Sequence, residues 1–81
     1  MGYILVVFTQ RKDAYQLYQL LLSQGYPAKI VNTPRELSAS CGISVRAGKE
    51  AYRAIERGAG ELRSLVAVYW YTVNSGYRRI G

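Results

Sequence analysis

Two apolar runs near the ends of the chain constrain its fold most. Tyr3–Phe8 and Leu65–Tyr71 are apolar at odd and even positions alike. Because alternate side chains of a strand point to opposite sides of a sheet, such runs are typical of strands covered on both faces. The chain has 81 residues, enough for one small domain and too few for two. Both runs are therefore expected in one sheet, with the first run at its centre.

Shorter patterns fill the chain between these runs. Apolar residues at helical spacing over 14–22 predict a helix, and Gly25 stands where glycine commonly ends one. Short strands are expected at 28–32, as a sheet edge, and at 43–46. A second amphipathic helix is expected from residue 49 and is closed by two glycines near residue 58.

The order strand, helix, strand, strand, helix, strand predicts an α+β fold. In a chain this short it indicates a ferredoxin-like βαββαβ sandwich, with a four-stranded antiparallel sheet and two helices on one face. We assign residues 1–73 to this single domain. Residues 74–81, which carry Arg78 and Arg79, are expected to form a loose basic tail.

Composition limits the chemistry available. The chain has one cysteine and no histidine, which excludes an intrachain disulfide, a Cys/His zinc site and a Cys-His or Ser-His-Asp catalytic pair. We expect no metal and no cofactor. The net charge of +6 allows an anionic partner without naming one. No signal peptide or membrane-length apolar run is visible, so we expect a cytoplasmic protein with a reduced thiol and no membrane partner.

The segment Thr33–Gly42 between two expected strands holds the cysteine. Thr33 and Glu36 have the spacing of a capping box, and Pro34 falls at the first helical position, so one or two helical turns are expected before Cys41. The candidate site residues are the thiol of Cys41 and, in support, Arg35, Ser38, Ser40, Gly42 and Arg46.

Cys41 has two interpretations. Free cysteines are often small buried hydrophobes. Connections between strands, however, lie at protein surfaces, and this favours an accessible thiol. A thiol is mostly protonated at neutral pH, and a nearby guanidinium would favour the thiolate. We expect Arg35 to supply that charge, although Arg35 and Arg46 are also explained as ordinary exposed side chains.

The run Thr-Pro-Arg-Glu-Leu-Ser-x-Ser-Cys-Gly at 33–42 resembles the motif of the selenium/sulfur carrier protein-like family, and the similarity covers roughly residues 3–71. The resemblance implies a thiol that carries sulfur or selenium, with Cys41 as the carrier and Arg35, Ser38 and Gly42 shaping its surroundings. It also implies donor and acceptor proteins as partners. We expect a carrier rather than a true enzyme.

Two other functions stay open. The protein could be a dimeric adaptor or regulatory module in which Cys41 is incidental, or it could bind nucleic acid through stacked aromatic side chains. Nucleic acid is disfavoured, because the expected strand at 43–46 lacks the aromatic pattern of RNA-binding modules. We expect a homodimer through the helix-free face of the sheet, anchored by Trp70 and either Tyr69 or Tyr71.

Overall fold

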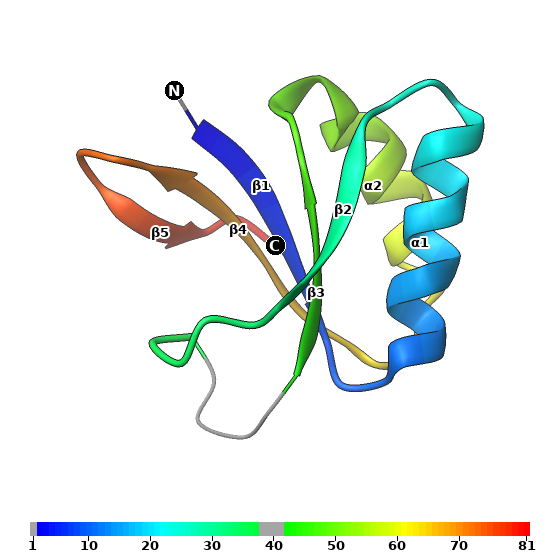
Figure 1. Ribbon diagram of the computed structural model, residues 1–81, viewed down its shortest axis with the longest axis horizontal. Helices are drawn as coiled ribbons and strands as arrows, with labels where there is room; N and C mark the ends of the chain where they lie inside the picture. Colours follow the sequence, from blue (N-terminus) through cyan, green and yellow to red (C-terminus); the bar gives the residue numbers. More distant parts are fainter. Residues whose placement is uncertain (1, 38–41) are drawn as a thin grey trace.

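The computed structural model describes residues 2–37 and 42–81. In this part of the chain, two helices pack on one side of an antiparallel sheet (Figure 1). The elements in chain order are β1 (Gly2–Phe8), α1 (Arg11–Ser23), β2 (Ala28–Asn32), β3 (Ile43–Ala47), the 3-10 turn η1 (Lys49–Ala51), α2 (Tyr52–Ala59), β4 (Leu65–Thr72) and β5 (Gly76–Arg79). The prediction of an α+β fold with two helices and an antiparallel sheet is confirmed.

The sheet has five strands in the order β2-β3-β1-β4-β5, so β1 is central and β2 is an edge, as expected. The prediction of four strands is wrong. β5 pairs with β4 from Thr72 opposite Gly76 to Tyr69 opposite Arg79, where a loose tail was expected. Gly76 has a φ of 69°, which glycine adopts without strain, and the chain can therefore reverse tightly after β4.

The main core lies between the sheet and the helices. Its largest fully buried side chains are Ile4, Val6 and Phe8 of β1, Leu17 and Leu21 of α1, Val45 of β3 and Ile55 of α2. The end of α1 is fixed by Gly25, whose φ is 86°, and by the Tyr26 N–H, which donates to the Leu21 carbonyl at 2.9 Å. This paired glycine and hydrogen bond are typical of a Schellman motif, and they direct the chain back toward β2.

The start of α1 is tied to the segment before β4 by Asp13. The Ser64 N–H donates to the Asp13 carboxylate at 3.0 Å, and this side chain is 8% exposed. Hydrogen bonds from Ser64 lower the pKa of Asp13. The ionised carboxylate also lies in the first helical turn, where negative charge is favourable.

The helix-free side of the sheet is covered more than its sequence suggested. Leu5 and Val7 point to this side because their neighbours in β1 face the helices, yet they are only 1% and 2% exposed. Residues 33–37 lie on the same side (Figure 1). The expected exposed apolar surface is therefore absent at these two residues, and the dimer prediction loses part of its motivation.

Trp70 does not lie on the helix-free side. It pairs with Ile4 across β1 and β4, and it packs against the core beneath the helices. Tyr69 and Tyr71 occupy the opposite face, since side chains alternate along a strand. The expected grouping of Trp70 with one of these tyrosines at a single interface is therefore wrong.

Candidate functional site

The connection between β2 and β3 is held together at its base. The last register pair of these strands is Asn32 opposite Ile43, and beyond it the Thr33 N–H donates to the Gly42 carbonyl at 3.2 Å. The hydroxyls of Thr33 and Ser44 are 2.7 Å apart, and Ser44 is fully buried. These bonds fix the two ends of the segment that contains Cys41 in the sequence.

A close approach of the backbone favours glycine at position 42. A Cβ atom at this position would lie 3.0 Å from the Thr33 Oγ1 and 3.1 Å from the carbonyl oxygen of Phe8 in the central strand. The glycine of the motif thus lets the connection lie directly against β1.

The expected short helix at residue 34 is not formed in the described part of the connection. Residues 35–37 form a turn instead, in which the Leu37 N–H donates to the Pro34 carbonyl at 3.0 Å. The Thr33 hydroxyl bonds to Ser44 and is not used as a helix cap. The capping box predicted one or two helical turns, and residues 35–37 form a turn instead, because the tertiary hydrogen bond of Thr33 competes with the cap; residues 38–41 lie outside the described residues.

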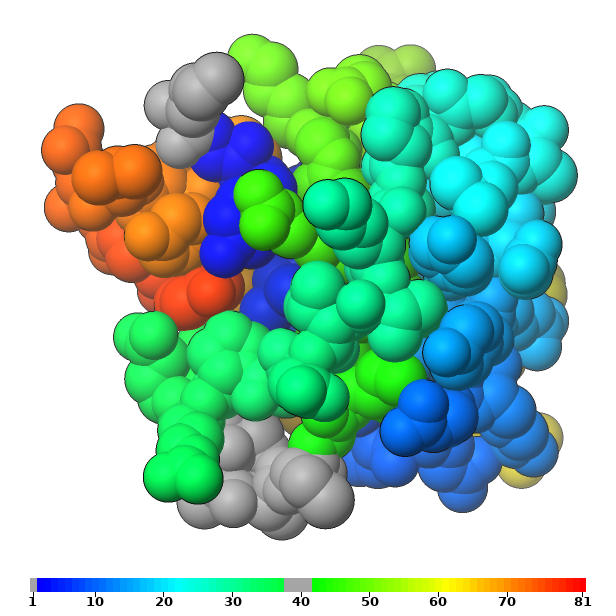
Figure 2. Space-filling view, in the orientation of Figure 1, coloured from blue at the N-terminus to red at the C-terminus, as the bar shows by residue number. Residues whose placement is uncertain are grey.

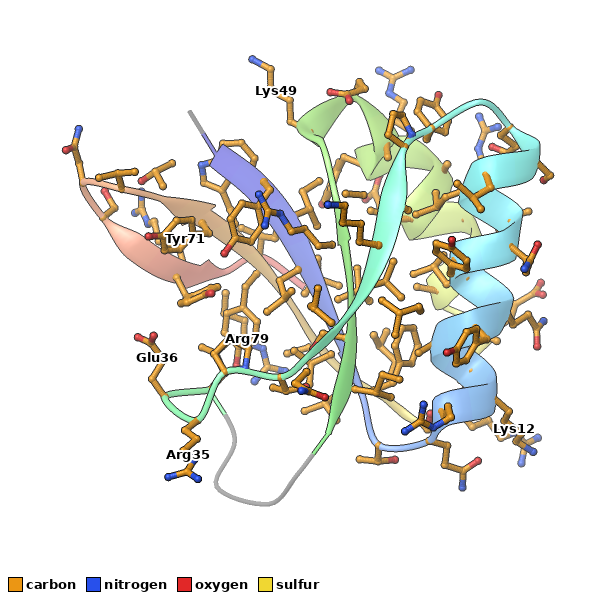
Figure 3. The ribbon with its side chains drawn as sticks, viewed as in Figure 1. Lys12, Arg35, Glu36, Lys49, Tyr71 and Arg79 are labelled. Carbon is orange, nitrogen blue, oxygen red and sulfur yellow. The ribbon has the colours of Figure 1, made fainter. Side chains whose placement is uncertain are left out.

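The predicted site residues occupy different places. Ser38, Ser40 and Cys41 lie outside the described residues. Arg35 is exposed near the tip of the connection, and its side chain and that of Glu36 point in opposite directions (Figure 3). Arg46 is four residues along β3 from Gly42, a separation of about 13 Å in an extended strand. The structure therefore does not bring Arg46 together with Gly42.

A cluster of tyrosines lies on the helix-free face and was not predicted from the sequence. We call it the tyrosine cluster, and its members are Tyr3 of β1, Tyr69 and Tyr71 of β4, and Tyr77 of β5. Tyr3 and Tyr71 are register partners whose rings stack with centroids 4.8 Å apart. Tyr71 and Tyr77 are also partners, with centroids 4.7 Å apart. The guanidinium of Arg46 lies 4.1 Å from the centroid of the Tyr3 ring. This contact occupies Arg46 and orients it over the sheet.

The hydroxyls of Tyr3 and Tyr77 meet at 3.0 Å and close the cluster. The pKa of Tyr77 is raised well above its ordinary value, chiefly because its phenol is partly buried. The hydrogen bond with Tyr3 and the negative charge of Glu36 raise it further. Glu36 belongs to the 33–37 segment and Tyr77 to β5. The two segments lie next to each other in Figure 2. Only one feature of the sequence could have predicted part of the tyrosine cluster: Tyr69 and Tyr71 are two residues apart, which places both rings on one face of a strand.

No group of three potential metal ligands is assembled within residues 2–37 and 42–81. Over the same residues, no helix is long and apolar enough to cross a membrane.

The fold and the connection define a small α+β domain that carries its single cysteine between two antiparallel strands. Residues 3–63 match the family model described as Putative Se/S carrier protein-like, and the chain belongs to this family. The resemblance inferred from the motif is confirmed at the level of the family. The match includes the whole connection at 33–42 and ends before β4 and β5. No curated protein and no solved structure matches the chain.

Proposed function

We propose that this protein carries sulfur or selenium on the thiol of Cys41. The observation that supports the proposal most is the family match over residues 3–63, which spans the cysteine. Cys41 is the only cysteine of the chain, so any thiol chemistry that the chain performs involves this residue. A carrier of this kind needs one accessible thiolate and neither a metal nor a histidine.

The proposed transfer is a thiol exchange that is balanced without an external oxidant. The Cys41 thiolate attacks the terminal sulfur of a donor persulfide. A new S–S bond forms on Cys41, the old S–S bond breaks, and the donor leaves as a thiolate. Delivery repeats the step in reverse: an acceptor nucleophile takes the terminal sulfur, and the Cys41 thiolate is released. Selenium would follow the same course from a donor that carries it bonded to sulfur.

Arg35 is the proposed electrostatic helper of Cys41. Arg35 is exposed in the turn at 35–37, where its guanidinium can attract a thiolate or an incoming anionic donor. Ser38, Ser40 and Gly42 are proposed to shape the surroundings of the thiol. Arg46 would act on Cys41 only at a distance, because it lies toward the other end of β3 and stacks on Tyr3.

The proposal extends to the fold type, the partners and the compartment. The order β2-β3-β1-β4 supports a ferredoxin-like unit to which β5 has been added at the edge. Donor and acceptor proteins are the expected partners of a carrier. A reducing compartment such as the cytoplasm would keep Cys41 free for loading. The homodimer remains a prediction that light scattering on the intact chain decides.

Loading is the direct test of the carrier. The reduced protein is incubated with a low-molecular-weight persulfide, and its intact mass is recorded before and after treatment with a reductant. We expect an increase of one sulfur atom that the reductant removes and that Cys41→Ser abolishes. A wild-type protein that gains no mass, while a small free thiol loads under the same conditions, would refute the carrier.

The role of Arg35 is tested separately through the pH profile of Cys41 alkylation. A guanidinium near a thiol lowers its pKa by about one unit, so Arg35→Gln should move the profile to higher pH by that amount. Arg57→Gln is the matched control, since Arg57 is an exposed arginine on α2. An unchanged profile in Arg35→Gln would remove the helper and leave the carrier intact.

A further inference from the structure

We propose that the helix-free face of the sheet binds single-stranded nucleic acid through the tyrosine cluster and the cations beside it. This surface is separate from the thiol proposed as the carrier. Three of the four tyrosines belong to β4 and β5, which lie beyond the residues matched by the family. The inference therefore rests on the arrangement of this chain and holds whether or not Cys41 carries sulfur.

The tyrosine cluster gives this face of the sheet an aromatic surface. The four rings of the tyrosine cluster come from three neighbouring strands and are each only partly buried. Tyr71 lies in the middle of the cluster, between Tyr3 and Tyr77 in the register of the strands, and Figure 3 places it toward the β4–β5 side of the molecule. The rings stack on one another and Arg46 lies over Tyr3, so an unpaired base would stack on the outer side of Arg46 and on the exposed parts of the cluster.

A set of cations flanks these rings. Arg46 is exposed and holds its guanidinium over Tyr3, so the side turned away from the ring can stack on a base. Lys29 lies directly opposite Arg46 on β2 and is also exposed. Like charges opposite each other in a sheet are unfavourable, and a phosphate bound between them would relieve the repulsion. Arg79, opposite Tyr69, extends the positive surface to β5.

The surface beside the rings is hollowed by open depressions. Two open depressions of about 770 and 370 Å³ meet at Tyr3 and Arg46. The larger is lined also by Tyr71 and extends beyond the helix-free face to Trp70 and Lys49 at the end of the sheet, and the smaller is lined by Lys29. Glu50 borders both depressions, and Glu36 lies near Tyr77, so the surface is not uniformly positive. Open depressions joined side by side suit an extended strand better than a single enclosed ligand.

The charges also decide between possible occupants. A second copy on this face would bring a second set of the same cations into one interface, at a cost in like-charge repulsion. An acidic peptide would satisfy the cations but would offer no flat group to the outer side of Arg46 or to the exposed parts of the rings. Single-stranded nucleic acid supplies phosphates and flat bases together, and the net charge of +6 favours its approach. The lack of aromatics in the strand at 43–46 disfavoured this partner, but the rings lie on β1, β4 and β5 instead.

Fluorescence anisotropy with the full-length protein and a labelled oligouridylate of about ten nucleotides tests the proposal. We expect binding at low salt that weakens with added salt, with a log–log slope of about −2 for three phosphate contacts. The matching oligodeoxythymidylate distinguishes RNA from DNA. Uridine monophosphate and polyglutamate serve as competitors, and both should compete far more weakly than the unlabelled oligonucleotide.

Paired variants locate the binding surface. Arg46→Gln should weaken binding and reduce the magnitude of the salt slope by about 0.7, whereas Arg57→Gln on α2 should leave both unchanged. Tyr71→Leu should weaken binding about tenfold, whereas Tyr15→Leu, at a residue of α1 that is 41% exposed, should not. Glu36→Gln should strengthen binding. If Tyr71→Leu unfolds, amide shifts of the wild-type protein on titration take its place and should concentrate on β1, β4 and β5.

Several results would overturn the proposal. They are the absence of binding at low salt, equal losses in Arg46→Gln and Arg57→Gln, and amide shifts confined to the helices. Equal competition by uridine monophosphate would indicate a nucleotide site, and equal competition by polyglutamate would indicate charge alone. A stable dimer that buries Tyr71 would assign the face to a second copy of the chain.

Discussion

Replacement of Gly42 by alanine tests whether the motif glycine is required by the fold. The new Cβ would lie 3.1 Å from the Phe8 carbonyl, which belongs to the central strand and cannot move aside, and 3.0 Å from the Thr33 Oγ1. Overpacking of this kind costs about 1–3 kcal/mol. The loss of chain entropy in the unfolded state offsets about 0.4–1 kcal/mol of that cost. We therefore expect a net loss of about 1 kcal/mol in the free energy of unfolding, equivalent to a fall of about 5 °C in Tm for a domain of this size.

Gly60 provides the matched control. Its φ is −61°, which alanine adopts without strain, and a Cβ there would have its nearest contact at an ordinary 3.6 Å, to the Glu56 carbonyl. Gly60→Ala should therefore stabilise the protein by about 0.5 kcal/mol. Thermal and urea unfolding followed by circular dichroism measure both variants. The steric argument fails if Gly42→Ala is as stable as Gly60→Ala.

Three further predictions concern the rest of the fold. The folded-state pKa of Asp13 is lowered, so the stability that it contributes is present at neutral pH and is lost as the pH falls through that value. Urea unfolding at several pH values should thus show Asp13→Asn converging with the wild type below about pH 4, and a constant gap would contradict this. The pKa of Tyr77 is raised in part by its hydrogen bond with Tyr3, so Tyr3→Phe should lower the titration midpoint of Tyr77, measured by tyrosinate absorbance. An unchanged midpoint would show that this hydrogen bond is not a cause of the raised pKa. Hydrogen exchange should be slowest at Ile4–Val7 in the central strand, and rates as fast as at β5 would count against the sheet order.

Local patterns predicted the elements where one physical cause dominates. The doubly apolar run at residues 3–8 became the central strand, and Gly25 ended α1 as expected, because burial and glycine conformation are each visible in a few adjacent residues. β5 was missed because its Arg78 and Arg79 resemble a solvated tail. Its pairing depends on Gly76 and on β4, and that register is not contained in its own four residues.

Contacts at the candidate sites that depend on long-range strand register could not be predicted from local sequence patterns. Tyr77 meets Tyr3 across 74 residues of sequence, and no local pattern indicates that pair. Trp70 could have been separated from Tyr69 and Tyr71 by strand alternation alone, and the prediction overlooked that signal. The Thr33 hydroxyl binds Ser44 rather than capping a helix, because the neighbouring strand offers a competing partner.

The intact mass of protein isolated under non-reducing conditions tests the central claim most directly. Cells that produce the chain are grown with sulfur or selenium as the supplied element, and wild-type protein is compared with Cys41→Ser. We expect a fraction of the wild-type protein to be heavier by one sulfur or one selenium atom, and we expect this added mass to be lost on reduction and absent from Cys41→Ser. Only the unmodified mass in the wild type, under both supplies, would contradict it.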